Sequence, residues 1–220
     1  SSSWTLTALP LFVWMGEILF RTKLSENLFK GLSPWMQKLP GGLIHVNVVG
    51  CALFAAISGS SAATVATVGK MSIPELRKRN YPEKILLGSL AGSGTLGLLI
   101  PPSIILIIYG VAVQESIAKL FIAGIIPGIM IALIFMSYVI IWSLINKKFM
   151  PKIIEEYSFL EKIKRSKQLL PVIILILAVI GSIYTGIATA TEAASLGVVG
   201  ALILSYFQKS LTLKTFKSSL

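Results

Sequence analysis

Two otherwise apolar stretches of the sequence are each interrupted by a run of small and polar residues. The first run covers residues 57–64 and is rich in Ser around Gly59. The second covers residues 92–103 and combines Ser, Gly and Thr with Pro101-Pro102. Because Gly and Pro disfavour helix interiors, both runs predict breaks that expose backbone carbonyls and amides. In hydrocarbon, such groups are tolerated only where they face protein or a wet cavity, so the breaks are candidate binding sites.

The residues in these runs have the oxygen atoms that a hard cation prefers. Carbonyls exposed at broken helices, together with hydroxyls, are natural ligands for sodium, and neutral ligands favour reversible binding. The candidate sodium ligands are Ser58, Gly59, Ser60, Ser93, Gly94, Thr95 and Gly97. An anionic group would instead bind amides at a helix N-terminus, where the helix dipole is positive. The candidates for this second role are Ser61, Thr64, Pro102 and Ser103.

Close helix packing is an alternative reason for the same residue types. Ser, Gly and Thr at helix interfaces allow membrane helices to approach one another. In that case the hydroxyls would stabilise the fold without binding a ligand, so their removal would change stability and leave ligand affinity unchanged.

The composition places these runs in an integral membrane protein. Hydrophobic residues make up 55% of the 220 residues and charged residues only 13%, which is unusual for a soluble domain. The net charge of +11 would suggest a nucleic-acid partner in a soluble protein, but here Lys and Arg lie in short segments between apolar runs. We therefore expect a lipid bilayer around the chain and no nucleic-acid partner.

The apolar runs predict the helices that position the two breaks. Runs with little or no charge cover residues 4–20, 43–68, 85–113, 120–146, 169–191 and 193–208. About 20 helical residues cross a bilayer, so each run except the first and the last can span it. The expected fold class is an all-α integral membrane protein, with transmembrane helices, a re-entrant helical hairpin and a discontinuous helix.

The basic residues indicate which run does not cross the membrane. Lys and Arg are in excess in residues 21–42, 69–84, 147–168 and 209–220. Such segments favour the cytoplasmic side. If the run at 43–68 crossed once, the two basic segments beside it would lie on opposite sides. The conflict disappears if this run enters from the cytoplasm, turns at Ser58-Gly59-Ser60 and leaves on the same side.

A helical repeat of apolar residues in the first basic segment predicts an amphipathic helix. The apolar positions are Leu24, Leu28, Phe29, Leu32, Trp35 and Met36. Since basic residues occupy the other faces, we expect this helix to lie in the cytoplasmic interface and to be anchored in lipid. A second such helix is expected between residues 147 and 167, with Tyr157, Leu160 and Ile163 on one side.

Short motifs along most of the chain occur in a characteristic order. They are Leu39-Pro40-Gly41-Gly42-Leu43, Val46-Asn47-Val48, Phe54-Ala55-Ala56-Ile57-Ser58-Gly59-Ser60, Ile100-Pro101-Pro102-Ser103, Tyr109-Gly110, Phe121-Ile122-Ala123-Gly124-Ile125-Ile126-Pro127-Gly128 and Thr189-Ala190-Thr191-Glu192-Ala193-Ala194. In these motifs the sequence resembles the N-terminal half of the large membrane (M, DctM-like) subunit of TRAP transporters.

The resemblance implies a role in a tripartite, sodium-coupled uptake system. In that family a periplasmic substrate-binding (P) protein delivers an organic acid, such as a C4-dicarboxylate or sialic acid, to the membrane subunits. The large subunit moves it by an elevator motion against a scaffold that a small four-helix (Q) subunit completes. The implied location is the bacterial inner (cytoplasmic) membrane, where the chain passes several times, with sodium as coupling ion, no other cofactor and no enzymatic activity.

The resemblance also implies a division of the chain into segments of an inverted-repeat transporter. Residues 1–42 would form a scaffold transmembrane helix and the interfacial helix, 43–69 the re-entrant hairpin, and 85–113 the discontinuous helix of the transport domain. Residues 118–168 would form a scaffold helix and a cytoplasmic connector. Residues 169–220 would open a second, incomplete repeat, so we expect the sequence to be part of a longer protein.

Three positions depart from what is common in that family. An acidic residue is common where Thr64 stands, and Pro is common at the positions of Leu98 and Ala190. The first two departures fall in the candidate site, so they bear on substrate preference and ion affinity.

Two alternative functions come from other classes. An intramembrane serine hydrolase would need a serine within hydrogen-bonding reach of a base, but the single histidine, His45, precedes Ser58 by about 13 residues, about 20 Å along a helix. A non-transporting membrane scaffold would assemble with partners and move nothing. Sodium-dependent uptake distinguishes a transporter from both.

Overall fold

The described part of the chain is almost entirely helical and contains no strand. The structure, a computed structural model, describes residues 4–21, 24–151 and 157–208. In chain order its α-helices and short 3-10 helices (η) are η1 (Trp4–Thr7), α1 (Ala8–Phe20), α2 (Leu24–Met36), α3 (Ile44–Ser58), α4 (Ser61–Lys78), α5 (Glu83–Gly94), η2 (Thr95–Leu98), α6 (Ile104–Val113), α7 (Ile117–Ile145), η3 (Lys147–Phe149), α8 (Phe159–Ser166), α9 (Leu170–Tyr184) and α10 (Ala190–Phe207). The predicted all-α class is confirmed.

Several helices have the length and composition of membrane helices. Among the described residues, α7 and α10 are each long and apolar enough to cross a bilayer, and the pair α8 and α9, bent by 53°, counts as a third candidate. Large apolar side chains of α7 point outward, including Ile126 at 76% and Leu133 at 58% exposure. An apolar surface of this kind is expected against lipid, so the chain is a membrane protein.

The predicted hairpin turn is present at the expected residues. Helix α3 ends at Ser58, Gly59 adopts a left-handed conformation, and Ser60 caps α4 by accepting the Ala63 amide at 3.5 Å. The second arm, however, was predicted to end near residue 69, and α4 continues to Lys78. Its last turn contains Arg77 and Lys78, whose positive charges stabilise a helix C-terminus.

The predicted discontinuous helix is also present. Helix α5 ends at Gly94 and passes through η2 into a non-helical segment, residues 99–103, before α6 begins. The Pro101–Pro102 peptide bond in this segment is cis. Neither proline has an amide hydrogen for a helical hydrogen bond, so the helix cannot continue through them.

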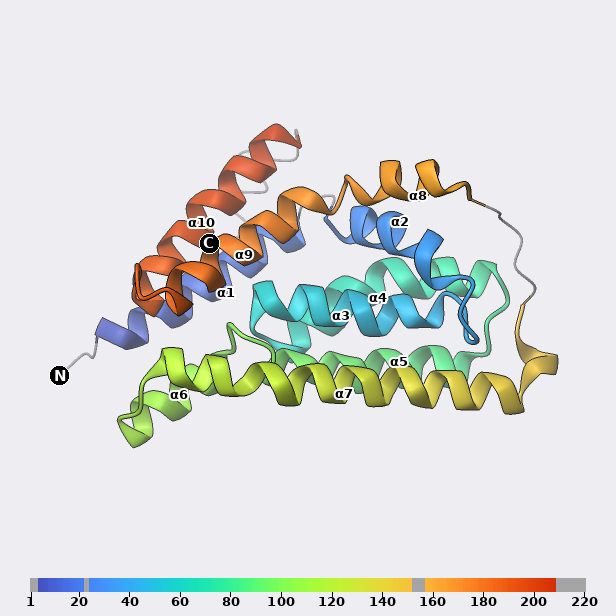
Figure 1. The fold of residues 1–220 in the computed structure, drawn as a ribbon, viewed down its shortest axis with the longest axis horizontal. Coiled ribbons are helices and arrows are strands. Elements are labelled where there is room, and N and C mark those ends of the chain that lie inside the picture. The colour runs from blue at the N-terminus through green and yellow to red at the C-terminus, as the bar shows by residue number, and fades with distance from the viewer. Residues whose placement is uncertain (1–3, 22–23, 152–156, 209–220) are drawn as a thin grey trace.

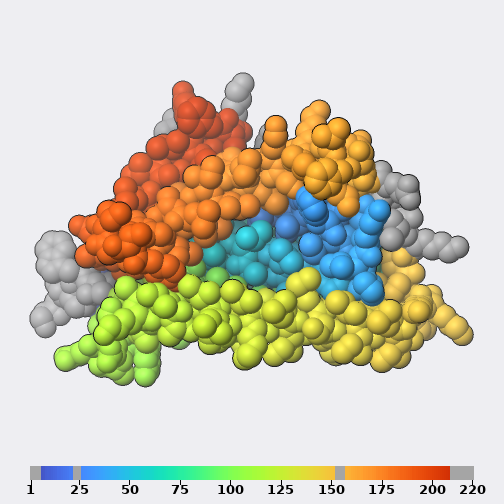
Figure 2. All heavy atoms as spheres, viewed as in Figure 1, coloured from blue at the N-terminus to red at the C-terminus, as the bar shows by residue number. Residues whose placement is uncertain are grey.

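The hairpin lies in the middle of the molecule. Helices α3 and α4 run side by side in opposite directions, α5, α6 and α7 cover one side of them, and α1, α9 and α10 lie on the other (Figure 1). Helices α2 and α8 lie together toward the end where the hairpin opens (Figure 1). Helix α3 reaches the surface in the space between α9 and α7 (Figure 2).

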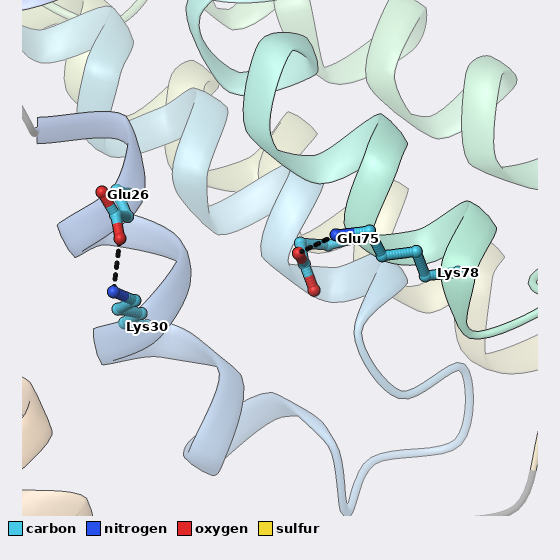
Figure 3. A network of polar contacts seen from close by, with 4 residues as sticks. All are labelled: Glu26, Lys30, Glu75 and Lys78. Atoms are coloured by element: carbon cyan, nitrogen blue, oxygen red, sulfur yellow. Dashed lines mark hydrogen bonds and ion pairs between the residues drawn. The ribbon is translucent and has the colours of Figure 1, made fainter.

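The apolar face of α2 packs against protein, which corrects the expectation that it is anchored in lipid. Leu28, Phe29 and Leu32 are 3%, 7% and 7% exposed and belong to the main hydrophobic core, beside α3 and α4. Beside this apolar face, Glu26 and Lys30 of α2 form an ion pair (Figure 3). An apolar stripe of helical period shows that one face is buried, but not whether lipid or protein buries it.

Of the two amphipathic helices, α8 presents the more exposed apolar side chains. Phe159 and Leu160 are 66% and 77% exposed. Helix α8 is held to α2 by the Trp35 indole, which donates to Ser166 Oγ at 2.8 Å and meets the Phe159 ring edge-on. Among the described residues, α8 thus has more exposed apolar surface than α2, and contact of α8 with lipid stays a prediction.

We expect the double substitution Leu28→Glu with Leu32→Glu to destabilise the protein strongly. Loss of each buried leucine costs about 2–5 kcal/mol, and a buried carboxylate adds a desolvation cost. The measurement is the melting temperature of the full-length protein in detergent. The matched control is Phe159→Glu with Leu160→Glu, at exposed positions of α8. If both double variants melt at the same temperature, α2 does not contribute its apolar face to the core.

Candidate functional site

The hairpin turn contacts the break in the discontinuous helix directly. The Gly59 carbonyl accepts a hydrogen bond from the Ile104 amide at 3.2 Å, which links the end of α3 to the first turn of α6. A Cβ atom at Gly59 would lie 2.5 Å from the Pro102 carbonyl oxygen. With φ of 59° at this residue, both space and backbone conformation require glycine.

A second close contact joins the hairpin to η2. A Cβ atom at Gly97 would lie 2.8 Å from backbone atoms of Ser60 and Ser61, and one at Gly94 would meet the side chain of Val65 in α4. Together these contacts bring most of the predicted site residues into one region. We call it the tip–break contact and define it by Ser58, Gly59, Ser60, Ser61, Thr64, Gly94, Gly97, Pro102 and Ser103.

Hydroxyl groups of the turn form a small network within the tip–break contact. Thr64 Oγ1 donates to the Ser60 carbonyl at 2.7 Å and lies 3.0 Å from Ser58 Oγ. Ser58 and Thr64 are 2% and 0% exposed. Thr64 is therefore a neutral member of a hydrogen-bonded turn, and the described residues bring no carboxylate into this network.

Ser61 differs from its neighbours because its hydroxyl is not engaged. Its Oγ atom is buried and has no hydrogen-bond partner among the described residues. Buried hydroxyls in proteins nearly always have a partner. Since Ser61 is also the first residue of α4, this hydroxyl lies at a helix N-terminus, and no hydrogen bond to a described residue uses it.

Ser103 links the two halves of the discontinuous helix. Its Oγ atom donates to the Leu98 carbonyl at 2.7 Å and accepts the Leu106 amide at 3.4 Å. The first bond satisfies a carbonyl freed by the break, and the second caps α6. Ser103 is fully buried, so this arrangement fixes the start of α6 beside the hairpin turn.

Two predicted ligands lie outside the tip–break contact. Ser93 is fully buried and donates to the Ser89 carbonyl of its own helix. Thr95 is exposed and donates to the Gly92 carbonyl at 2.7 Å. Such bonds to a preceding turn are common for Ser and Thr in helices, and they engage both hydroxyls locally.

The helix dipoles at the tip–break contact have a definite arrangement. Helix α3 ends there, and so does α5 with its extension η2, while α4 and α6 begin there. The C-terminal ends carry partial negative charge and the N-terminal ends partial positive charge. One small region can therefore attract a cation to carbonyls and an anion to amides.

Sequence reasoning missed the contact that aligns α3 with α5. The buried Asn47 of α3 donates through Nδ2 to the Leu86 carbonyl at 3.2 Å and to Ser89 Oγ at 3.0 Å. A buried amide in an apolar helix signals a polar partner, but the sequence does not indicate which helix supplies it.

The histidine needed for a hydrolase is in the wrong place. His45 Nε2 lies 2.8 Å from the Pro40 carbonyl oxygen, at the start of α3, whereas the serines of the turn lie at and just beyond its other end. Fifteen residues of α3 span about 22 Å. The base and the candidate nucleophiles are thus too far apart for proton transfer.

Comparison with known proteins agrees with these features. The family model described as tripartite ATP-independent periplasmic transporter, DctM component, matches residues 1–220. The C4-dicarboxylate TRAP transporter large permease protein DctM of Pseudomonas aeruginosa is 36% identical over 94% of this chain and 48% of its own length. The sialic acid TRAP transporter permease protein SiaT of Haemophilus influenzae is 35% identical over 99% of this chain and 35% of its own length.

A further relative joins two components in its name. The isethionate TRAP transporter permease protein DctMQ of Oleidesulfovibrio alaskensis is 35% identical over 93% of this chain and 32% of its own length. The chain spans about half the length, or less, of these three relatives. A family model that matches from end to end decides the relationship: the chain belongs to the DctM family of tripartite ATP-independent periplasmic transporters, whose members are permease components and not enzymes.

Proposed function

We propose that this chain forms half of the permease component of a sodium-coupled uptake system for an organic acid. The observation that carries the proposal is the tip–break contact, where two helix C-termini and two helix N-termini meet in an apolar molecule. Broken helices that meet in this way bind coupling ions and anionic substrates in secondary transporters.

An organic acid is the substrate class that the site chemistry favours. The three relatives are named for C4-dicarboxylate, sialic acid and isethionate, which are all organic anions. In this proposal the acidic group binds at the N-terminal ends of α4 and α6, near Ser61, Thr64, Pro102 and Ser103. The unengaged hydroxyl of Ser61 is the first donor that it would meet.

Sodium would bind on the carbonyl side of the same contact. Ser58, Gly59, Ser60, Gly94 and Gly97 contribute oxygen atoms at or next to the tip–break contact. Ser93 and Thr95 would contribute through backbone carbonyls, because their hydroxyls are engaged within α5 and η2. Neutral ligands of this kind favour release as well as binding, which transport requires.

The proposed partners follow from the family description and from the relatives. A tripartite periplasmic transporter needs a periplasmic substrate-binding (P) protein, and the fused name DctMQ supports a small Q subunit as the second membrane component. We place the assembly in the bacterial inner membrane. The completed site includes the part of the permease that the relatives have beyond this chain.

The proposal keeps the hairpin re-entrant. Helix α3 has 15 residues and is about 22 Å long, less than the roughly 30 Å of the hydrocarbon core. The start of α3 and the end of α4 lie at the same end of the molecule as the end of α7 (Figure 1). Arg77, Lys78 and Lys147 lie at this end, which we take as cytoplasmic.

An elevator motion fits the way in which the helices group. Helix α7 packs against α3, α5 and α6, while α1 packs mainly against α10. The first group holds the tip–break contact, so in our proposal it moves and the second group stays fixed. This grouping assigns α7 to the moving part, whereas the family resemblance assigned residues 118–168 to the scaffold.

Single cysteines test the re-entrant topology in full-length protein that lacks the native, buried Cys51. We expect Lys78→Cys, at the end of α4, to react with an impermeant maleimide only from the cytoplasmic side, and Glu115→Cys, between α6 and α7, only from outside. Ser72→Cys serves as a control for folding, because Ser72 is 1% exposed and should stay unlabelled. Labelling of Lys78→Cys from outside would rule out the re-entrant hairpin.

Uptake into proteoliposomes that contain the full complex tests the site. We expect Ser58→Ala to raise the sodium concentration for half-maximal uptake, because the Ser58 hydroxyl is a candidate sodium ligand and donates to the Ser60 carbonyl of the turn. We expect Ser61→Ala to raise the substrate concentration for half-maximal uptake instead. A lost interaction of about 1.4 kcal/mol gives a tenfold change in either value.

The control for both variants is Ser137→Ala. The Ser137 hydroxyl donates to the Leu133 carbonyl within α7, so the substitution removes a comparable bond outside the tip–break contact. The contradicting outcome is that both site variants show the same dependence of uptake on sodium and on substrate as Ser137→Ala, and differ only in the amount of folded protein. In that case these hydroxyls serve helix packing, and the proposed site is wrong.

A further inference from the structure

A cavity lies at the opposite end of α3 from the hairpin turn. Its volume is about 470 Å³, and three segments enclose it: the loop before α3, the connection between α4 and α5, and the end of α7. The loop contains Gly41 and Gly42, which have φ of 102° and 54°. A Cβ atom at Gly41 would lie 2.6 Å from Val139 Cγ1, so the glycines let this loop approach α7 closely.

The charged groups that line this cavity are all cationic. They are Lys38, Arg79 and Lys147, and none of the lining residues is acidic. Within the described part of the chain, neither Lys38 nor Lys147 forms an ion pair with a carboxylate. On this concave surface, Lys38 and Lys147 beside Arg79 give a local excess of positive charge, which favours an anionic ligand.

The neighbouring groove between α2, α4 and α8 provides a contrast. Its lining contains three carboxylates and three basic groups, namely Glu26, Lys30, Glu75, Arg79, Glu161 and Arg165. Acidic and basic side chains pair along these helices, as Glu26 does with Lys30 and Glu75 with Lys78 (Figure 3). Of these two hollows, therefore, only the cavity at the start of α3 has an excess of positive charge in its lining.

A buried hydroxyl on the cavity wall also lacks a partner. Ser143 of α7 is 3% exposed, lines the cavity and has no hydrogen-bond partner for its Oγ atom among the described residues. The nearby Tyr81 hydroxyl, by contrast, accepts the Leu43 amide at 3.0 Å. Burial raises the pKa of Tyr81, so this hydroxyl stays protonated and adds no negative charge to the wall.

We propose that this cavity binds a phosphate-bearing anion. Lys38, Arg79 and Lys147 supply the charge, and the Ser143 hydroxyl supplies a neutral donor to one phosphate oxygen. The headgroup of an anionic phospholipid is one source of the phosphate, because the cavity lies where the apolar helix α7 ends and its lining includes Leu39, Leu144 and Met150. Inorganic phosphate in the cytoplasm is the other source. Binding would hold the hairpin to α7 and does not depend on the proposed transport function.

The test is native mass spectrometry of the full-length protein with three probes: phosphatidylglycerol, phosphatidylcholine and inorganic phosphate. We expect the double variant Lys38→Gln with Lys147→Gln to bind the preferred probe about thirtyfold more weakly, which corresponds to about 1 kcal/mol for each cation. The matched control is Lys84→Gln with Lys164→Gln, which removes the same charge outside the cavity lining. Ser143→Ala should weaken the same probe without changing net charge.

The probes distinguish the two sources. Preference for phosphatidylglycerol over phosphatidylcholine, lost in the cavity variant, identifies a lipid headgroup, while binding of inorganic phosphate that is lost in the same variant identifies the soluble anion. The proposal is overturned if the cavity variant, eluting as a folded protein, binds every probe as tightly as the control pair, or if the wild type binds none.

Discussion

Backbone groups freed in an apolar environment are the constraint on which the rest of this structure depends. Helical structure breaks at two places in the chain, and each break frees carbonyls and amides that lipid could not satisfy. The structure solves this by placing the breaks against each other, with the Gly59 carbonyl bonded to the Ile104 amide and the Ser103 hydroxyl bonded to the Leu98 carbonyl. Glycine is required at 59 and 97 because the two backbones come too close for a side chain.

The contact between the two breaks has the chemical groups to bind charged ligands without charged side chains. The described residues of the tip–break contact contribute hydroxyls, carbonyls, amides and helix ends. A site of this kind binds ions through fixed dipoles. In the proposed function, sodium binds at the helix C-terminal ends of this contact, and the organic acid binds at its helix N-terminal ends.

The sequence predicted the breaks well because Gly and Pro act locally. The turn at Gly59 and the interruption before α6 were found at the expected residues. The end of α4 was placed too early, since hydropathy falls at Lys70 while the helix continues into a basic last turn. The apolar stripe of α2 was expected to contact lipid, although protein covers it. Helical periodicity shows that one face is buried, but not whether lipid or protein buries it.

The candidate site was predicted in part for the same reason. The hairpin turn and the residues around Pro102 were named as candidates, and the structure shows that they lie together. The hydroxyls of Ser93 and Thr95 bond to carbonyls of the preceding turn, which depends on side-chain direction. Asn47 donates to Ser89, which depends on tertiary contact. Neither property has a local sequence signal.

The central claim is that hairpin and discontinuous helix bind sodium as one unit. The most direct measurement is the shift in melting temperature of the full-length protein when sodium replaces choline, compared between Gly97→Ala and Gly88→Ala. A Cβ atom at Gly97 would push against Ser60 and Ser61, whereas one at Gly88 meets nothing within 4 Å. We predict that Gly88→Ala keeps the sodium-dependent shift and Gly97→Ala loses most of it. Equal shifts in both variants would contradict the claim.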